Sequence, residues 1–200
     1  MKHRIRHVDG QAQAVKITRA RPQEVRLIGG QWKRSKLPVA DAPGLRPTPD
    51  RVRETLFNWL GQDLTGWKVL DAFAGSGALG FEAASRGAAE AVLLEREPAL
   101  VVSLRASKQR LGAQTLHVER AEALVWMAHA TAGSFDLVML DPPFGAGLGA
   151  PALAEAARLV RVGGLVYLES DSFNDPVPPS LQLYRELRAG AVHARLFQRS

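Results

Sequence analysis

The spacing of hydrophobic residues divides the chain of 200 residues into distinct regions. From Trp67 onward, short apolar runs alternate with longer segments in which apolar residues recur at helical spacing. The apolar runs predict strands at Lys68–Ala72, Ala91–Glu95, Thr115–Glu119, Phe135–Leu140 and Leu165–Glu169. The segments between them predict helices at about Ala78–Arg86, Pro98–Leu111, Ala121–Ala130 and Ala150–Val160. Uniformly apolar strands separated by helices are typical of an α/β fold with a parallel, doubly wound sheet.

The pattern changes again near the end of the chain. Residues 181–190 and 191–199 are two β-prone runs joined through Gly190. They predict a final hairpin that adds an antiparallel strand at or beside one edge of the sheet.

The region before Trp67 has a different character. Residues 1–21 contain few apolar positions and predict a flexible basic arm. Residues 22–47 predict a β-hairpin extension and a turn-rich connector, with β-prone runs at Val25–Ile28 and Trp32–Val39 around two glycines. The main domain, residues 48–200, then begins with a helix that Thr48 caps, and one face of that helix is apolar.

Composition limits the class of protein. Hydrophobic residues make up 46% of the chain, which is enough for one sizeable core. The absence of cysteine excludes a disulfide framework and a thiolate zinc site, and fits a cytoplasmic location. The sequence contains neither a secretory signal nor an apolar run of about 18 residues, so we expect no membrane span.

Charge is distributed unevenly along the chain. The net charge is +6, but residues 1–53 carry +9 and the remaining residues carry −3. Three of the cations, Lys33, Arg34 and Lys36, lie close together on the second arm of the predicted hairpin. This asymmetry favours an anionic partner, with nucleic acid first, over the alternative of a solvated basic tail.

A glycine-rich turn follows the first predicted strand of the main domain. Gly75, Gly77 and Gly80 have the spacing of a dinucleotide fingerprint, which allows a tight turn and close approach of a ligand. Asp71, at the strand end, would repel a pyrophosphate but suits a cationic ligand such as the amino group of S-adenosylmethionine. Glu95 ends the next strand and can accept from both ribose hydroxyls. NAD and a turn without a ligand are the alternatives.

Two acids follow the third predicted strand. Either Glu119 or Glu122 can accept from an adenine amino group, and we favour Glu122. The alternative is that Glu122 only places a negative charge at the start of a helix.

The most apolar strand ends in Asp141-Pro142-Pro143-Phe144. The Asp141 carboxylate and the Pro142 carbonyl, held by the fixed φ of proline, can accept both hydrogens of an exocyclic amine. This favours a pyramidal nitrogen whose lone pair points at a methyl donor. Phe144 can stack on a base swung out of its helix. The alternative is an ordinary turn after a strand.

Four segments together resemble a known family. They are "GGQWKRSKLPVADAPGLRPTPDRVRETLFNWL", "DAFAGSGALGFEA", "MLDPPF" and "YRELRAGAVHARLFQR". The chain resembles, over about residues 24–199, the bacterial small-subunit (16S) ribosomal RNA guanine-N2 methyltransferases. The resemblance implies a class I S-adenosylmethionine-dependent methyltransferase fold, with a seven-stranded sheet whose last strand is antiparallel and an N-terminal β-hairpin extension.

The resemblance also implies an activity and its residues. The activity is methylation of the N2 amine of one guanine in small-subunit ribosomal RNA, as naked RNA or within an assembled or partly assembled 30S subunit. The expected cofactor residues are Asp71, Phe73, Ala74, Gly75, Ser76, Gly77, Glu95, Arg96, Glu122 and Ala123. The expected guanine-binding residues are Asp141, Pro142, Pro143 and Phe144. The expected RNA-binding residues are Lys33, Arg34, Lys36, Arg46, Arg51 and Arg53. The alternative for the four arginines is that they help to build the site.

Two other functions remain open from the sequence. Methylation of adenine N6 or cytosine N4 would use the same acceptor chemistry. A non-catalytic RNA-binding assembly factor could have kept the scaffold. We expect a monomer without a metal ion.

Overall fold

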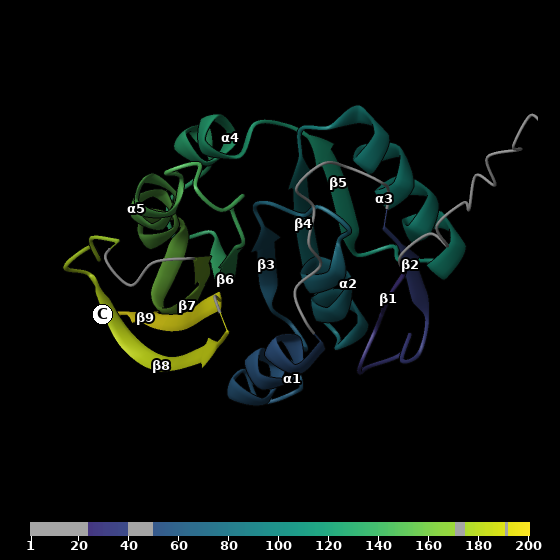
Figure 1. The fold of residues 1–200 in the computed structure, drawn as a ribbon, viewed down its shortest axis with the longest axis horizontal. Helices are drawn as coiled ribbons and strands as arrows, with labels where there is room; N and C mark the ends of the chain where they lie inside the picture. The colour runs from purple at the N-terminus through teal and green to yellow at the C-terminus, as the bar shows by residue number, and fades with distance from the viewer. Residues whose placement is uncertain (1–23, 40–49, 171–174, 191) are drawn as a thin grey trace, which may run out of the picture.

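The computed structural model describes residues 24–39, 50–170, 175–190 and 192–200 (Figure 1). The expected flexible arm at residues 1–21, the Thr48 cap and most of the connector lie outside these residues. Among the helices of the described residues, none is long and apolar enough to cross a membrane.

The centre of the molecule is a seven-stranded sheet with the strand order β5-β4-β3-β6-β7-β9-β8. Its strands are β3 Lys68–Asp71, β4 Glu90–Glu95, β5 Leu116–Arg120, β6 Phe135–Leu140, β7 Val160–Ser170, β8 Leu181–Ala189 and β9 Val192–Arg199. All neighbouring strands pair in parallel except at β9, which pairs antiparallel with both β7 and β8. The predicted fold class, with an antiparallel last strand, is therefore confirmed.

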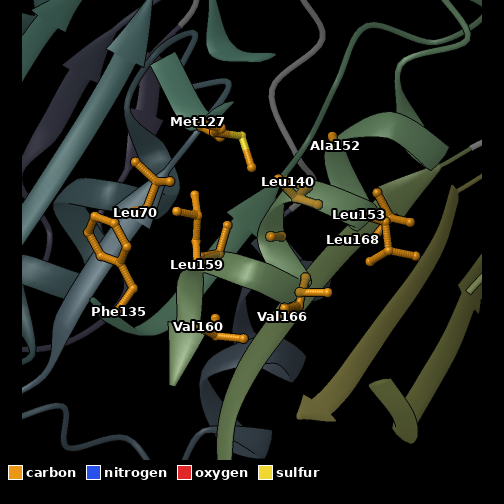
Figure 2. Close-up of a cluster of buried hydrophobic side chains, with 14 of the residues drawn as sticks. Leu70, Met127, Phe135, Leu140, Ala152, Leu153, Leu159, Val160, Val166 and Leu168 are labelled. Atoms are coloured by element: carbon orange, nitrogen blue, oxygen red, sulfur yellow. The ribbon is translucent and has the colours of Figure 1, made fainter. Parts of the chain in front are cut away.

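Helices cover both faces of the sheet (Figure 1). On one face, α4 (Ala123–His129) and α5 (Gly149–Leu159) bury apolar residues of β3, β6 and β7, several of which Figure 2 labels. On the other face lie α1 (Asp50–Trp59), α2 (Ala78–Ser85) and α3 (Pro98–Leu111). The strands are apolar on both faces because each face is covered by helices.

A two-stranded hairpin of β1 (Glu24–Arg26) and β2 (Lys36–Pro38) forms an additional layer outside α2. Leu27 and Leu37 share a buried cluster with Phe81 and Ala84 of α2. Because the hairpin covers its outer side, all eight residues of α2 are buried.

The structure differs from the predictions in two strands. Trp32, predicted in a strand, lies in a turn, because its backbone N–H donates to Ser85 Oγ at the end of α2 instead of to a paired strand. β7 begins at Val160, five residues before the predicted start at Leu165. Gly163 and Gly164 lie inside this strand and made its first half look like a loop.

Candidate active site

Acidic residues stand where neighbouring strands end. Asp71 is the last residue of β3, Glu95 is the last residue of β4, and Asp141 follows β6 directly. These strands are adjacent in the order β4-β3-β6 and run parallel, so their carboxyl ends meet at one edge of the sheet. Ligands of open parallel sheets bind at this edge.

The glycine-rich turn between β3 and α2 fits tightly against its surroundings. Gly77 has φ 79°, and a Cβ there would lie 2.6 Å from the Leu104 side chain. A Cβ on Gly80 would lie 2.4 Å from Leu93 and 3.1 Å from Asp71 Oδ2. A side chain at position 77 would collide with α3, and one at position 80, in the first turn of α2, would collide with β4, which explains the predicted glycine pattern.

Asp71 is buried beneath this turn, and the backbone N–H of Gly80 donates to its Oδ2 at 2.8 Å. Burial raises the pKa of Asp71 to about 7, and the charges of Asp141 and Glu95 add to this effect, while the Gly80 hydrogen bond opposes it. A cationic group bound nearby would favour the ionised carboxylate.

We expect the contribution of Asp71 to the free energy of unfolding to fall as pH rises from about 4 to 7. The folded protein retains this proton up to about pH 7, whereas the unfolded chain releases it near the ordinary value of 3.8. Asp71→Asn keeps an oxygen for the Gly80 N–H and should flatten the dependence. Urea unfolding of both proteins between pH 4 and 8 measures the difference, and parallel curves would contradict the prediction. Asp63→Asn is the control at an exposed position. Hydrogen bonds from Thr65 lower the pKa of Asp63, so this group titrates below the pH range of the experiment.

Glu95 links β4 to the glycine-rich turn. Its Oε2 accepts the Gly75 N–H at 2.9 Å and its Oε1 accepts the Glu97 N–H at 2.9 Å. Each carboxylate oxygen has a second lone pair with which to accept from a ribose hydroxyl. Arg96, the next residue, is exposed and pairs with Glu97 at 3.5 Å.

Glu119 and Glu122 are both engaged within the protein. Glu122 caps α4, where it accepts the Val125 N–H at 2.8 Å, so its helix-start role is confirmed. Glu119 accepts the Trp126 indole N–H at 2.6 Å. An open pocket of about 550 Å³ adjoins these residues and is lined by Ala121, Glu122, Val125, Trp126, His129 and Ala130. An adenine contact by Glu122 stays a prediction.

The segment after β6 leaves the sheet at the same edge. Asp141 is half-buried and Pro142 is buried, while Pro143 and Phe144 are exposed. The Phe144 side chain is 49% exposed, which is unusual for a large aromatic ring and suits stacking on a ligand. Gly145 and Gly147, with φ 72° and 67°, then turn the chain toward α5.

The predicted RNA-binding residues are separated in space. Lys33 and Arg34 are exposed in the hairpin loop. The neighbouring Gln31 N–H donates to Ser85 O, so this loop lies at the far end of α2 from the glycine-rich turn, about 12 Å along an eight-residue helix. Lys36 pairs with Glu24 at 2.6 Å. Arg51 is exposed on α1, and Arg46 lies outside the described residues.

The prediction of an RNA contact by Arg53 is wrong. Its side chain is completely buried, donates to Arg26 O at 2.9 Å and to Asp50 Oδ1 at 2.6 Å, and lies 3.8 Å from Glu82. Arg53 lies off the apolar stripe of its helix, so hydrophobic periodicity does not predict its burial. The hairpin covers that side of the helix, a long-range contact that periodicity does not report.

Two further polar residues near the site were not singled out from the sequence. Tyr167 and Glu169 lie on β7 beside Asp141, and the Tyr167 hydroxyl donates to Glu169 Oε1 at 2.8 Å. Both side chains are buried. In the strand segment "LVYLES" they only alternate with apolar residues, and this pattern does not indicate a functional role.

The site suits S-adenosylmethionine by its donor and acceptor set. Asp71 is a buried acid at the end of β3 that suits a cationic methionine group, and Glu95 can accept from a ribose. The turn backbone is kept open by glycine, so Gly75 to Gly77 can approach a ligand closely. Phe73, Ala74, Ser76 and Ala123 lie in or next to these segments and stay predicted contacts.

Comparisons with known proteins agree with this geometry. The family described as Conserved hypothetical protein 95 matches residues 25–198. Ribosomal RNA small subunit methyltransferase D of Escherichia coli (strain K12) is 45% identical over 184 residues, which cover 88% of this chain and 90% of that protein. The protein of the same name from Haemophilus influenzae is 38% identical over 181 residues, covering 88% and 94%. The solved structure of yhhF from Escherichia coli, at 39% identity and a TM-score of 0.80, covers 88% and 98%.

Proposed function

The chain belongs to the family of Ribosomal RNA small subunit methyltransferase D, and on this premise we propose that it methylates the N2 amine of one guanine in 16S ribosomal RNA. It is an S-adenosylmethionine-dependent ribosomal RNA methyltransferase. Our proposal concerns which amine of the RNA is methylated and which residues bind it. The half-buried Asp141 and its prolines, beside the Asp71–Gly77 turn, are the observation that carries the proposal.

The cofactor supplies a methyl group on a positively charged sulfur. Asp71 and Glu95 lie on the two strands beneath the glycine-rich turn and provide the negative charge and the acceptor oxygens that such a cofactor requires. Asp141 and the carbonyl of Pro142 accept the two hydrogens of the amine and fix its lone pair toward the methyl group. Phe144 stacks on the flipped base. Positioning and electrostatics supply most of the rate, because the reaction requires no strong base.

We propose that the substrate is small-subunit ribosomal RNA, bound by one copy of the chain in the cytoplasm. The acids, the glycine-rich turn and Asp141 to Phe144 all come from a single chain. The comparison of deproteinised RNA with partly and fully assembled 30S subunits as substrates identifies the form that is methylated.

The experiment that tests the function uses labelled cofactor. Small-subunit RNA is methylated, digested to nucleosides and separated, and we expect the label in N2-methylguanosine. Label only in N6-methyladenosine or N4-methylcytidine would contradict the guanine assignment while supporting amino methylation. Cofactor binding by calorimetry without any transfer to RNA or subunits would favour the non-catalytic assembly factor.

Reversal of the hairpin-loop charges should weaken RNA binding. Lys33→Glu with Arg34→Glu removes two exposed cations, and the slope of log K against log salt should decrease in magnitude by about 0.7 for each lost phosphate contact. Filter binding from 50 to 300 mM salt measures the slope. Arg105→Glu, which reverses one exposed cation on α3, is the control for a charge change outside the loop. Equal slopes for the double variant and the wild type would mean that the loop does not contact RNA.

A further inference from the structure

The last turn of α3 lies against the hairpin that carries the exposed cations. Strand β2 and helix α3 are side by side (Figure 1), and they share a buried apolar cluster. The Arg110 guanidinium donates through Nη2 to Lys36 O at 2.6 Å, although the two residues are 74 positions apart in the chain. Arg110 is exposed, so its side chain lies on the outer surface of this junction. The fold therefore brings Arg110 next to the strand that follows Lys33 and Arg34.

The distances between these cations are short. Arg34 and Lys36 are two residues apart, so their Cα atoms are separated by no more than about 7 Å. The Arg110 guanidinium is in contact with the Lys36 backbone. Adjacent nucleotides of a stacked strand are about 3.4 Å apart, so a short stretch of one nucleic-acid strand can reach all of these positions.

Few negative charges oppose these cations. Lys36 is paired with Glu24 at 2.6 Å, and both side chains of this pair are half-exposed. Among the residues that the structure describes, no acid forms an ion pair with Lys33, Arg34 or Arg110. Arg110 uses one N–H donor for Lys36 O, and a guanidinium has five, so donors remain for a phosphate. A ligand with several phosphates matches this arrangement of positive charge.

Arg34 has a backbone conformation that favours glycine. Its φ is 73°, and in the described part of the chain Gln62 is the other non-glycine residue with a positive φ. A side chain costs free energy in this conformation. The Arg34 side chain is exposed, so packing within the protein does not offset that cost. A charged side chain at such a position indicates a role outside the fold.

The place of Arg110 in its helix explains a positive charge but not its direction. Lys108 and Arg110 stand in the last turn of α3, where a cation interacts favourably with the carboxyl end of the helix. Arg105 of the same helix is also exposed, but its guanidinium donates to Val118 O of β5 at 3.4 Å. Arg105 therefore points to the edge of the sheet, whereas Arg110 points to the hairpin.

We propose that Arg110, Lys33 and Arg34 form one RNA-binding surface, the hairpin–α3 surface, which holds phosphates of the substrate RNA at a distance from the reacting base. The inference rests on the proposed function, methylation of small-subunit ribosomal RNA. The surface lies at the far end of α2 from the glycine-rich turn, about 12 Å along this helix. Phosphate contacts at that distance position the RNA but do not read its bases. Their loss raises the RNA KM and leaves kcat at saturating RNA unchanged.

Arg110→Gln is the test, and Arg105→Gln on the same helix is the matched control. Glutamine removes one charge and keeps an N–H that can donate to the same backbone oxygen. At about 150 mM salt, we expect Arg110→Gln to weaken binding of a small-subunit RNA fragment about three- to tenfold. The slope of log K against log salt should decrease in magnitude by about 0.7. Filter binding measures both quantities, and Arg105→Gln should change neither.

Arg34→Gly separates RNA contact from a role in folding. Glycine adopts a φ of 73° without strain, so the midpoint of urea unfolding should not fall. RNA binding should nevertheless weaken by a factor similar to that of Arg110→Gln. A residue with a purely structural role would instead lower the midpoint and leave the salt slope of the folded protein unchanged.

The outcomes distinguish failure of the surface from failure of the function. Equal salt slopes for Arg110→Gln, Arg105→Gln and a wild-type protein that methylates the RNA overturn the proposal and leave the proposed function intact. An equal loss of slope in the two glutamine variants also overturns it, because the effect is then one of net charge. If Arg110→Gln does not fold, Arg34→Gly decides: weaker RNA binding at an unchanged urea midpoint supports the surface, and wild-type binding overturns it. A wild-type protein that methylates no RNA contradicts the proposed function, and the inference falls with it.

Discussion

Asp141→Ala should reduce methyl transfer by about 10²- to 10³-fold, as expected when a group that stabilises the transition state is removed. The carboxylate follows β6 directly at the carboxyl edge and lies next to the strand that leads into the glycine-rich turn. Without it, only the Pro142 carbonyl can accept from the amine, and the lone pair is no longer fixed toward the methyl group. Single-turnover kinetics with saturating cofactor measures the loss directly.

Calorimetry of the same variant provides the control. The cofactor affinity should stay within a few-fold of the wild type, because the Asp71, Gly75 and Glu95 contacts are intact. Asp141→Asn, which keeps one acceptor oxygen without the charge, should lie between alanine and the wild type. An alanine variant that methylates at the wild-type rate would refute the proposed mechanism.

Glu82→Ala should lower the free energy of unfolding by about 3–5 kcal/mol, the usual cost of breaking a buried ion pair. Its carboxylate accepts the Ile28 and Gly29 N–H groups at 2.8 and 2.7 Å and binds Arg86 at 2.7 Å. The completely buried Arg53 lies 3.8 Å away. Removal of this one carboxylate leaves the buried Arg86 guanidinium without its anion and leaves Arg53 with Asp50 as its remaining acid. It also leaves two backbone donors without an acceptor.

Chemical denaturation measures this loss, and hydrogen exchange locates it. Exchange should rise first at the Ile28 and Gly29 amides, because the hairpin loses its attachment to α2. Glu155→Ala removes the acid of a half-exposed pair with Arg158 on α5 and should cost about 1 kcal/mol or less. Equal losses in the two variants would mean that the buried cluster contributes no more than a surface pair.

Much of the fold could be predicted because hydrophobic residues recur with different spacings in the strands and in the helices of the main domain. The five parallel strands and the final hairpin were all anticipated, and their boundaries mostly agree within two residues. The order of the strands and the insertion of β9 between β7 and β8 depend on tertiary packing, which the spacing of hydrophobic residues does not predict. The early start of β7 was missed because Gly163 and Gly164 resemble a turn.

The candidate site could be predicted where residue type and position act together. Asp71, Glu95 and Asp141 were recognisable because each is an acid at the end of an apolar run. Glu169 has a similar placement, one residue before the end of β7, but lacks a neighbouring glycine or proline motif. Arg53 was misjudged because its partner Glu82 lies 29 positions further along the chain, and only the folded structure brings the two together.

The layer formed by the hairpin over α2 determines how this chain can be divided. Leu27 and Leu37 complete the burial of Phe81 and Ala84. Both carboxylate oxygens of Glu82 accept N–H groups of the hairpin backbone. A hybrid enzyme that borrows only the sheet and its helices would therefore expose an apolar helix to water. The smallest portion that can be transplanted as a unit starts before the first strand of the sheet, at the hairpin itself.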